Sequence, residues 1–542
     1  MVFINACAAI QSPPGGPKDE TPPELIETIP ANGTILFEGG RIELIFSEYV
    51  DENSVEKAIR ILPTMDPPPE IIYKGRRVFV EMPDSLAQNQ TYIVSIDRTL
   101  KDEHKVPLAQ GIQVAFATGN KIDEGQISGR VFHEDPSSVH LWRVEPNDTL
   151  SSVYLAQPDY VVDASDEGVF EFNYLSNGDY RLIAVDRLAA GAVLSSERMK
   201  YGLPWMNSIQ VSETQHQILD VQMMIPPSRQ GIKMSSAKWM NGAWGTLTFS
   251  SSISDIFSRL KITAIDEDSV EQTLTTFMDS HDDLKLHFVV SGIENQSYLT
   301  LKNQQIIEKD DRVVEEGFIK IKVDTTQDTT FTQVTHPGKK FTLNIEEDET
   351  VMLPISFNRH INTDSSSNAF SLKQDTLPIP FNVQWKSPLT VELIPLENWL
   401  PKKEYSISIF RDSLLVIHGR SLADSMNTIS FKTSTFQGYG QLLGSVENSE
   451  RQPLIAEITS MEKEPKQFRT VVNSNSTFTM NRIPEGNYSL LFFQDSHENQ
   501  RYSYGRVEPF QPAEWFYHYP DTVKIRTNWD LELNQIKLEH IP

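Results

Sequence analysis

Short apolar stretches, each bounded by Gly, Pro, Asn or Asp, recur along the whole chain. Clear examples are residues 41–46, 77–81, 91–96, 180–185 and 405–409, in which apolar residues either alternate with polar ones or form short runs. Successive side chains of a β-strand point to opposite faces, so a period of two indicates strands with one buried face. Helical periodicity is scarce. The pattern therefore predicts an all-β chain built from tandem β-sandwich modules.

A second pattern is an internal repeat. Phe46 ends one apolar stretch, and Phe357 ends a similar one 357 − 46 = 311 positions later. Further pairs follow in the same order: Tyr92 with Tyr405, Phe116 with Phe431, Gly125 with Gly440, and Tyr180 with Tyr488. Collinear matches at nearly constant spacing predict a duplicated pair of modules. The strand-like stretch between the copies predicts a middle sandwich without a counterpart.

The single cysteine, Cys7, stands near the N-terminus, so the body of the chain has no disulfide framework. Residues 4–7 (Ile-Asn-Ala-Cys) resemble a bacterial lipobox, and residues 11–23 are a Pro/Gly-rich stretch typical of a tether. We expect a signal peptide that is trimmed or lies before the printed start, with Cys7 as the first mature residue and the site of a lipid anchor. The alternative is an incidental cysteine in a tail.

The first copy also carries a family resemblance. It opens with Thr-Pro-Pro-Glu-Leu at 21–25 and Ile-Pro-Ala-Asn-Gly at 29–33, continues through residues 45–50 and closes with Phe-Ala-Thr at 116–118. These residues resemble the S-layer-type bacterial Ig-like domain. Together with Cys7 they resemble Bacteroidota lipoproteins that begin with this domain. The resemblance implies a β-sandwich in the cell envelope, an outer-membrane lipid anchor and no enzymatic activity.

The second module of each copy resembles the carboxypeptidase regulatory-like domain, a small transthyretin-like sandwich. The resemblance rests on residues 125–131 and on the Gly-Asp-Tyr and Gly-Asn-Tyr turns at 178–180 and 486–488. We expect Gly178 and Gly486 to supply a positive φ before a buried strand. The resemblance implies a binding or spacer module without catalytic residues.

Together these signals predict the domain organisation. The predicted segments are a lipoprotein N-terminus and tether (1–20), an Ig-like domain (21–120), a carboxypeptidase regulatory-like domain (124–225), a middle sandwich (230–337), a second Ig-like domain (338–436) and a second carboxypeptidase regulatory-like domain (437–541).

Charge and motifs narrow the function. The formal net charge of −26 disfavours binding to nucleic-acid phosphates. The sequence holds no zinc-protease, nucleophile-elbow or Walker motif, so we predict no catalytic residues, no metal and no cofactor. His133 and His140 are predicted to lie in a surface loop. Asp163, Asp166 and Glu167 are predicted to form an acidic turn and not a Ca²⁺ site.

Two groups of residues are candidates for binding or modification. The aromatic run Trp515, Phe516, Tyr517 and Tyr519 is a candidate partner surface, since aromatic side chains dominate interface energetics, with a core role as the alternative. Asp-Ser/Thr motifs resemble the O-glycosylation signal of exported Bacteroidota proteins, with ordinary turns as the alternative. The candidate acceptors are Ser85, Thr149, Thr376, Ser413 and Thr522. The sequence thus predicts an outer-membrane scaffold or interaction subunit with a protein partner in the envelope; the alternative is a glycan-binding or adhesive protein.

Overall fold

The computed structural model describes residues 19–538, apart from residues 197, 229–230, 292, 294–295, 308–312, 325, 327, 348, 448–452 and 464. This part of the chain is all-β, with one short α-helix, α1 (Glu52–Ala58). None of its helices combines the length and the hydrophobicity that crossing a membrane requires. It divides into two compact units. Of the described residues, unit 1 contains 19–228 and Ser503–Trp515, and unit 2 contains 231–502 and Phe516–Leu538.

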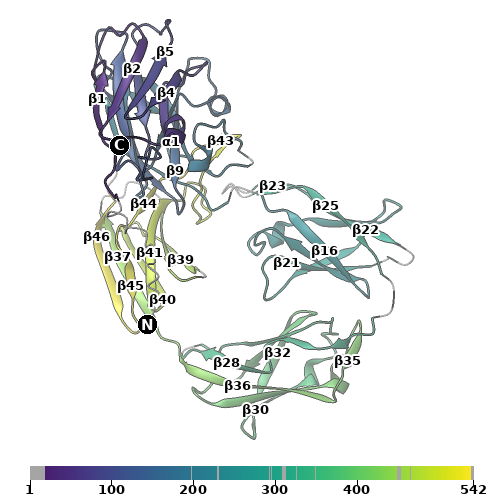
Figure 1. Ribbon diagram of the computed structural model, residues 1–542. Helices are drawn as coiled ribbons and strands as arrows, with labels where there is room; N and C mark the ends of the chain where they lie inside the picture. Colours follow the sequence, from purple (N-terminus) through teal and green to yellow (C-terminus); the bar gives the residue numbers. More distant parts are fainter. Residues whose placement is uncertain are drawn as a thin grey trace, which may run out of the picture. The chain divides into compact units, whose positions relative to one another are not determined.

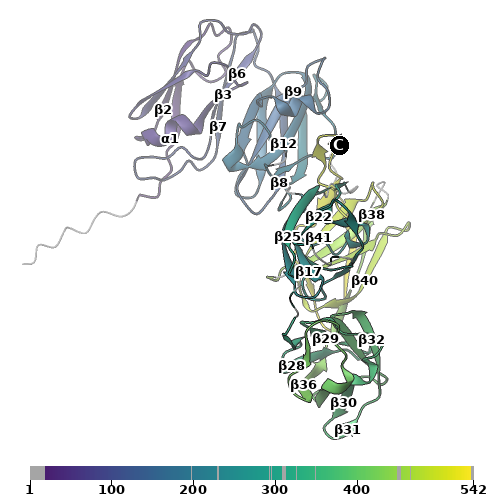
Figure 2. The same cartoon turned by 90° about the vertical axis from the view of Figure 1, so that its right-hand side faces the viewer.

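The first sandwich of unit 1 packs the sheet β1-β2-β5-β4 against the sheet β3-β6-β7, as Figures 1 and 2 show. Its strands are β1 (Leu25–Ile29), β2 (Gly40–Phe46), β3 (Ile59–Leu62), β4 (Glu70–Lys74), β5 (Arg77–Met82), β6 (Thr91–Ile96) and β7 (Ile112–Ala117). In β2 the side chains of Ile42, Leu44 and Phe46 are buried, while Glu43 and Ile45 between them are half-buried. The predicted alternation is confirmed here.

The second sandwich of unit 1 consists of the sheets β11-β8-β15 and β10-β9-β12-β13, with β14 also paired to β12. Its strands are β8 (Gly125–Phe132), β9 (Ser137–Arg143), β10 (Tyr160–Asp163), β11 (Val169–Leu175), β12 (Gly178–Asp186), β13 (Tyr201–Gly202), β14 (Ile209–Val211) and β15 (Gln217–Met224). The strands β8 and β15 run parallel, unlike their neighbours.

Unit 1 also holds a short hairpin from late in the sequence, β42 (Arg506–Val507) and β43 (Phe510–Gln511). The ring of Phe510 stacks on Tyr154 of the second sandwich, with centroids 5.9 Å apart. The backbone N–H of Ala513 donates a hydrogen bond to the carbonyl of Pro204 (3.2 Å). The segment Ser503–Trp515 therefore lies in unit 1, whereas the residues on both sides of it in the predicted 437–541 domain lie in unit 2.

The third sandwich, in unit 2, consists of the sheets β16-β17-β21-β20 and β19-β18-β22-β25 (Figure 1). Its strands are β16 (Met234–Met240), β17 (Trp244–Phe249), β18 (Ile262–Ile265), β19 (Glu271–Gln272), β20 (Leu274–Met278), β21 (Lys285–Val290), β22 (Tyr298–Asn303) and β25 (Gly317–Lys322), with the small hairpin β23 (Ile306–Ile307) and β24 (Val313–Val314).

The fourth sandwich consists of the sheets β27-β29-β33-β32 and β28-β36-β34-β30-β31. Its strands are β27 (Val334–His336), β28 (Lys340–Ile345), β29 (Leu353–Phe357), β30 (Phe370–Gln374), β31 (Leu377–Pro378), β32 (Phe381–Ser387), β33 (Thr390–Pro395), β34 (Glu404–Phe410) and β36 (Met426–Phe436), with the parallel pair β26 (Phe331–Thr332) and β35 (Arg420–Leu422). Because β27 pairs with β29, this module begins before the predicted boundary at 338. A three-residue strand is too short to show a period in the sequence.

The fifth sandwich consists of the sheets β40-β37-β46 and β39-β38-β41-β44, with β45 paired to β41. Its strands are β37 (Tyr439–Glu447), β38 (Leu454–Ser460), β39 (Gln467–Val471), β40 (Thr477–Pro484), β41 (Gly486–Gln494), β44 (Phe516–His518), β45 (Val523–Ile525) and β46 (Asp530–Lys537). Its strand order repeats that of the second sandwich.

The predicted duplication is confirmed by topology and by hydrogen bonds. Phe46 and Phe357 end equivalent strands, because the order β1-β2-β5-β4 recurs as β27-β29-β33-β32. The hydroxyl of Tyr92 accepts a hydrogen bond from the backbone N–H five residues earlier (2.9 Å), and the hydroxyl of Tyr405 does the same (3.1 Å).

The role expected for two glycines is wrong. Gly178 and Gly486 do not have positive φ; the left-handed residues are Tyr174 (φ 60°) and Arg482 (φ 58°), four positions earlier in each copy. These two residues lie near the ends of the preceding strands, β11 and β40, and not in the Gly-x-Tyr turns. A glycine is required instead at Gly125, where a Cβ atom would lie 2.3 Å from the carbonyl oxygen of Leu175.

Candidate functional site

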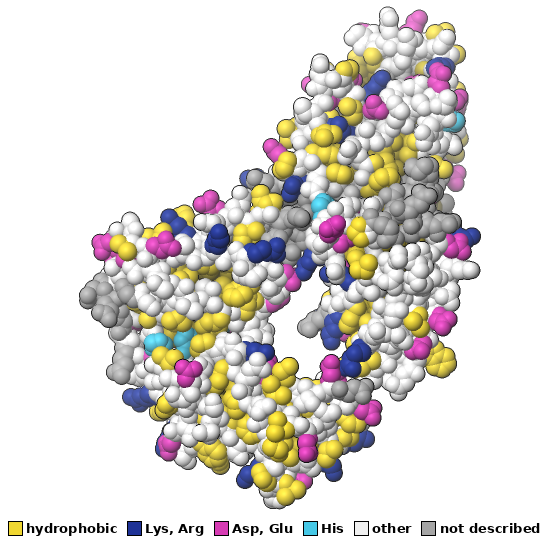
Figure 3. Space-filling view, turned by 180° about the vertical axis from the view of Figure 1, so that it is seen from behind, with side chains coloured by type: hydrophobic (Ala, Val, Ile, Leu, Met, Phe, Trp, Pro, Cys, Tyr) yellow, Lys and Arg dark blue, Asp and Glu magenta, His cyan; other side chains and the backbone are white. Residues whose placement is uncertain are grey.

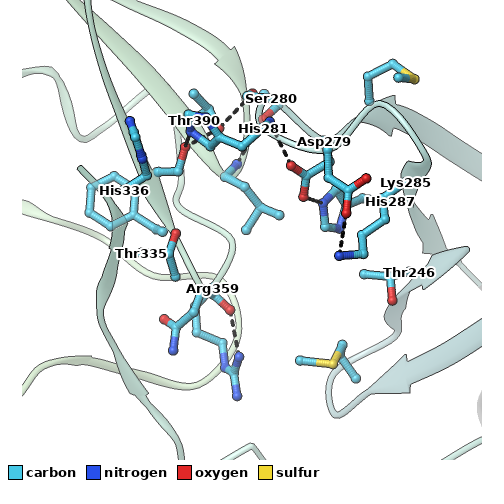
Figure 4. A pocket seen from close by; sticks show the side chains of 18 of the residues that line it. Thr246, Asp279, Ser280, His281, Lys285, His287, Thr335, His336, Arg359 and Thr390 are labelled. Atoms are coloured by element: carbon cyan, nitrogen blue, oxygen red, sulfur yellow. Dashed lines mark hydrogen bonds and ion pairs between the residues drawn. The ribbon is translucent and has the colours of Figure 1, made fainter. Parts of the chain in front are cut away.

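A cleft of about 570 Å³ lies in unit 2 where the third and fourth sandwiches meet. The third sandwich contributes β16, β17 and the β20–β21 turn, and the fourth contributes β27, β29 and the β32–β33 turn. Figure 4 shows Asp279 and His287 on the side of the third sandwich and His336 and Arg359 on the side of the fourth. Histidine side chains also lie together on the surface of unit 2 in Figure 3.

On the third-sandwich side, a carboxylate and an imidazole form a tight pair. Nε2 of His287 lies 2.8 Å from Oδ2 of Asp279, and Oδ1 of Asp279 accepts a hydrogen bond from the backbone N–H of His281 (2.9 Å). The hydrogen bond with His287 lowers the pKa of Asp279 to about 2. Asp279 is therefore ionised at neutral pH and holds the β20–β21 turn in place.

On the opposite side, hydroxyl groups link the two sandwiches. Nε2 of His281 lies 2.9 Å from Oγ of Ser356, and the hydroxyl of Ser280 donates to Oγ1 of Thr390 (3.0 Å). The ring of His336 lies 4.0 Å from that of His281, centroid to centroid. Burial, followed by the neighbouring His281, lowers the pKa of His336, so that ring is neutral at physiological pH.

These groups do not form an acid–base–nucleophile set. A triad needs one imidazole that contacts both the carboxylate and the nucleophile. Here Asp279 contacts the ring of His287, whereas Ser356 contacts the ring of His281. The cleft can bind a polar ligand through its imidazole, hydroxyl and ammonium groups, but this arrangement of its residues does not activate Ser356.

A further histidine, His360, is buried beside the cleft. Its ring lies 4.2 Å from Trp244 and 5.7 Å from Phe277, centroid to centroid, and its Nε2 has no hydrogen-bond partner among the described residues. Burial, reinforced by the nearby His418 and His287, lowers the pKa of His360 to about 3.

We expect unit 2 to lose stability as the pH falls from about 6.5 towards 4. His360 has a folded pKa of about 3 against 6.5 in the unfolded chain, so the unfolded state binds the extra proton below 6.5. The stability is complete above that pH, and one such proton changes the free energy of unfolding by up to about 1.4 kcal/mol per pH unit. Urea unfolding of the full chain at several pH values measures this slope.

The variant His360→Phe keeps the contacts with Trp244 and Phe277 and removes the titrating group. In this variant the slope of the free energy of unfolding against pH should decrease by the amount that corresponds to about one proton. The variant His216→Ala, at an exposed position of unit 1, should leave the slope of unit 2 unchanged. An unaltered slope in His360→Phe would show that other groups govern the pH dependence.

The candidate partner residues are divided between core and surface. Trp515 is only 4% exposed and Phe516 only 3% exposed. Tyr517 and Tyr519 are half-buried, and the backbone N–H of Tyr519 donates to the carbonyl of Leu490 (2.9 Å). For Trp515 and Phe516 the placement favours the core alternative, because a ring with so little exposed surface has little area left for a partner. Partner binding at Tyr517 and Tyr519 stays a prediction.

The candidate modification residues are mostly accessible. Ser85, Thr149, Thr376 and Thr522 are exposed, and Ser413 is half-buried. Their accessibility suits a modifying enzyme, and O-glycosylation stays a prediction. Cys7, the predicted lipidation site, lies outside the described residues.

The structure places the two histidines that were predicted to lie in a surface loop, His133 and His140, in different surroundings. His140 is in β9 and fully buried, where its Nε2 accepts a hydrogen bond from the backbone N–H of Gly191 (2.8 Å) and burial lowers its pKa to about 4. His133 lies 2.9 Å from Asp186. The surface-loop prediction is therefore wrong for His140, because the pairing of β9 with β12 turns its side chain inward.

Two carboxylates of the predicted acidic turn form ion pairs, and Asp163 is the last residue of β10. Asp163 pairs with Arg187 (2.9 Å), and Asp166 pairs with Arg98 (3.0 Å). The absence of a Ca²⁺ site at this turn stays a prediction.

Sequence reasoning did not find the cleft. Its two sides come from separate parts of the chain: the contact between His281 and Ser356 spans 75 positions. The available signal was weak, namely that His281, His287 and His336 fall within a short part of a chain that has 12 histidines.

The chain is a tandem β-sandwich protein, and the cleft lies between two of its sandwiches. Residues 19–118 match the bacterial Ig-like domain family. No curated protein sequence matches the chain. Similar solved structures include the N-terminal part of the bacterial S-layer protein SbsC (11% identity, TM-score 0.17, 31% of this chain and 41% of that one). They also include native alpha-2-macroglobulin from Escherichia coli (12% identity, TM-score 0.14, 56% of this chain and 97% of that one). A third is the major pilin subunit of Bacillus cereus (9% identity, TM-score 0.13, 76% of this chain and 99% of that one). At these TM-scores the likenesses assign no function.

Proposed function

We propose that this chain is a non-enzymatic lipoprotein of the bacterial cell envelope that acts as a scaffold or interaction subunit, anchored in the outer membrane of a Bacteroidota bacterium through Cys7. In this proposal the second and fifth sandwiches are carboxypeptidase regulatory-like spacer modules. The observation that carries the proposal is that neighbouring sandwiches within each unit share buried or hydrogen-bonded junctions. Such junctions hold binding surfaces at fixed positions, which a scaffold requires.

In unit 1 the junction has an apolar and a polar part. Leu62 and Ile93 of the first sandwich belong to the same buried cluster as the core of the second sandwich. The hydroxyl of Thr91 donates to Oδ2 of Asp123 (2.8 Å), and the backbone N–H of Thr64 donates to the carbonyl of Asp159 (2.7 Å). Burial of apolar area shared by both modules opposes bending at this junction.

In unit 2 the junctions are mainly polar. The third and fourth sandwiches are joined by the contact of His281 with Ser356 and by Trp244 against His360. Between the fourth and fifth, Tyr439 donates a hydrogen bond to Glu346. These contacts between neighbouring sandwiches oppose the relative motion that flexible Pro/Gly-rich linkers allow.

The alternative, a glycan-binding or adhesive protein, is favoured by the cleft of unit 2. It offers hydroxyl, imidazole and ammonium groups around a volume of about 570 Å³, within the range of small-ligand sites. Thr246 faces this cleft in Figure 4. Thr246→Arg should abolish binding to a glycan array if the alternative holds, and should leave capture of a protein partner intact if the scaffold role holds.

The proposal is tested with a tagged chain expressed from its chromosomal locus. We expect it to fractionate with outer membranes and, after detergent extraction, to retain an envelope protein in stoichiometric yield. Cys7→Ser should move the chain to the soluble fraction, because a protein anchored by lipid needs the acylated thiol. Ser12→Ala, a change of similar size in the same segment, should not.

Two outcomes count against the proposal. Retention of Cys7→Ser in the outer membrane would exclude the lipid anchor. Binding to the glycan array, without a stoichiometric protein partner, would replace the scaffold role by the adhesive one.

A further inference from the structure

Three carboxylates and one imidazole converge at one edge of the first sandwich. Asp19, Glu48, Asp102 and His104 each place one ligand atom so that all four atoms lie within 4.8 Å of one another. Asp19 precedes β1, Glu48 follows β2, and Asp102 and His104 lie in the loop between β6 and β7. We call these four residues the Asp19–His104 cluster. Segments from three parts of the sequence therefore meet at one point.

One carboxylate oxygen of the cluster, in Asp102, is buried without a hydrogen-bond partner among the described residues. The side chain of Asp102 is fully buried (0% exposed), and its Oδ1 accepts a hydrogen bond from the backbone N–H of Val106 (2.7 Å). Its Oδ2 is buried and has no hydrogen-bond partner among the described residues. A buried carboxylate oxygen without a partner is costly, and in native proteins it usually marks a missing ion or water.

The neighbouring charges add to this cost. The carboxylate oxygens of Asp19, Glu48 and Asp102 lie within 4.8 Å of one another, so their negative charges repel each other. Lys105, in the same loop, does not neutralise the cluster, because its ammonium group pairs with Asp51 (2.9 Å). Nδ1 of His104 lies 3.4 Å from Oδ2 of Asp19 and is the nitrogen donor of the group.

We propose that the Asp19–His104 cluster binds a divalent transition-metal ion, with Zn²⁺ as the ion that its donors favour. Carboxylate oxygens and an imidazole nitrogen are ordinary Zn²⁺ ligands, and four protein donors satisfy its tetrahedral preference. Ca²⁺ takes six to eight oxygen ligands and gains little from an imidazole. The ion supplies the partner that Oδ2 of Asp102 lacks and offsets the repulsion among the three carboxylates.

The bound ion would fasten the start of the described chain to the sandwich. Asp19 is the first described residue, and it lies within the stretch that the sequence predicts to be a tether. Metal binding would tie this residue to the end of β2 and to the β6–β7 loop. The direction in which the chain leaves the domain then depends on the metal, independently of what the protein as a whole binds.

The test is isothermal titration of the metal-stripped full chain, in a Cys7→Ser background so that the thiol does not bind the ion. We expect one Zn²⁺ per chain, bound at least about tenfold more tightly than Ca²⁺ or Mg²⁺, and a Zn²⁺-dependent rise in the melting temperature of unit 1. His104→Ala changes an exposed side chain, and Asp102→Asn removes a buried charge; each should weaken Zn²⁺ binding at least about tenfold.

A second cluster provides the matched control. His133, Asp135 and Asp186 also bring their ligand atoms within 4.8 Å, but Lys200 lies 3.9 Å from Asp135. Asp135→Asn should therefore leave Zn²⁺ binding unchanged. The proposal is overturned if the parent chain binds no Zn²⁺, if it binds Ca²⁺ more tightly, or if His104→Ala and Asp102→Asn bind Zn²⁺ as the parent does.

Discussion

Replacing Asp328 by Ala is expected to destabilise unit 2 by about 3–5 kcal/mol. Oδ2 of Asp328 lies 2.6 Å from Nε of Arg359, and both side chains are buried, with 4% and 9% exposed. Without the carboxylate, the guanidinium is left charged and poorly solvated in the interior, since arginine does not deprotonate in proteins. The pair lies where the third and fourth sandwiches join, so the change should also loosen that junction. Urea unfolding of the full chain measures the loss.

Two further variants distinguish the effect of breaking this buried ion pair from the effect of breaking a surface ion pair. Glu404→Ala breaks the pair of Glu404 with Lys432 (2.7 Å), whose side chains are 65% and 70% exposed, and should change the midpoint little. The double variant Asp328→Leu with Arg359→Met removes both charges and should recover much of the loss. If Asp328→Ala unfolds at the midpoint of the parent, the pair does not stabilise the junction.

Replacing Trp515 by Ala is expected to destabilise unit 1 by about 3–5 kcal/mol, the usual cost of removing a large buried ring. The indole is only 4% exposed, and it ends the segment Ser503–Trp515 that packs with the second sandwich. Truncation leaves a cavity that the surrounding β-strands are unable to close, because their register is fixed by backbone hydrogen bonds. Differential scanning calorimetry should show the loss as a lower melting temperature of unit 1.

The chain supplies a control of the same residue type. Trp529 is 63% exposed, so Trp529→Ala should change the free energy of unfolding by no more than about 0.5 kcal/mol. If Trp515→Ala melts like the parent and loses a protein partner, then Trp515 is a contact residue after all, as the aromatic run first suggested.

The hydrophobic pattern was sufficient to predict the strands, the tandem sandwiches and the duplication. Burial on one face of a strand leaves a period of two in the sequence, as Ile42, Leu44 and Phe46 show. The repeat was visible because both copies keep the same core positions, so Phe46 and Phe357 end equivalent strands. The period of two is a local signal that depends on neighbours along one strand, and the repeat is a comparison of such local signals in two copies.

Long-range packing decided which of the candidate residues named from the sequence lie on the surface, in the core or in a site. The run from Trp515 to Tyr519 has the composition of a binding surface, yet its first two rings are buried. His281 meets Ser356 across 75 positions, and Asp19 reaches Asp102 through the close approach of three separate segments. Such contacts leave no period or motif in the sequence, because strand pairing brings the residues together without constraining the residues between them.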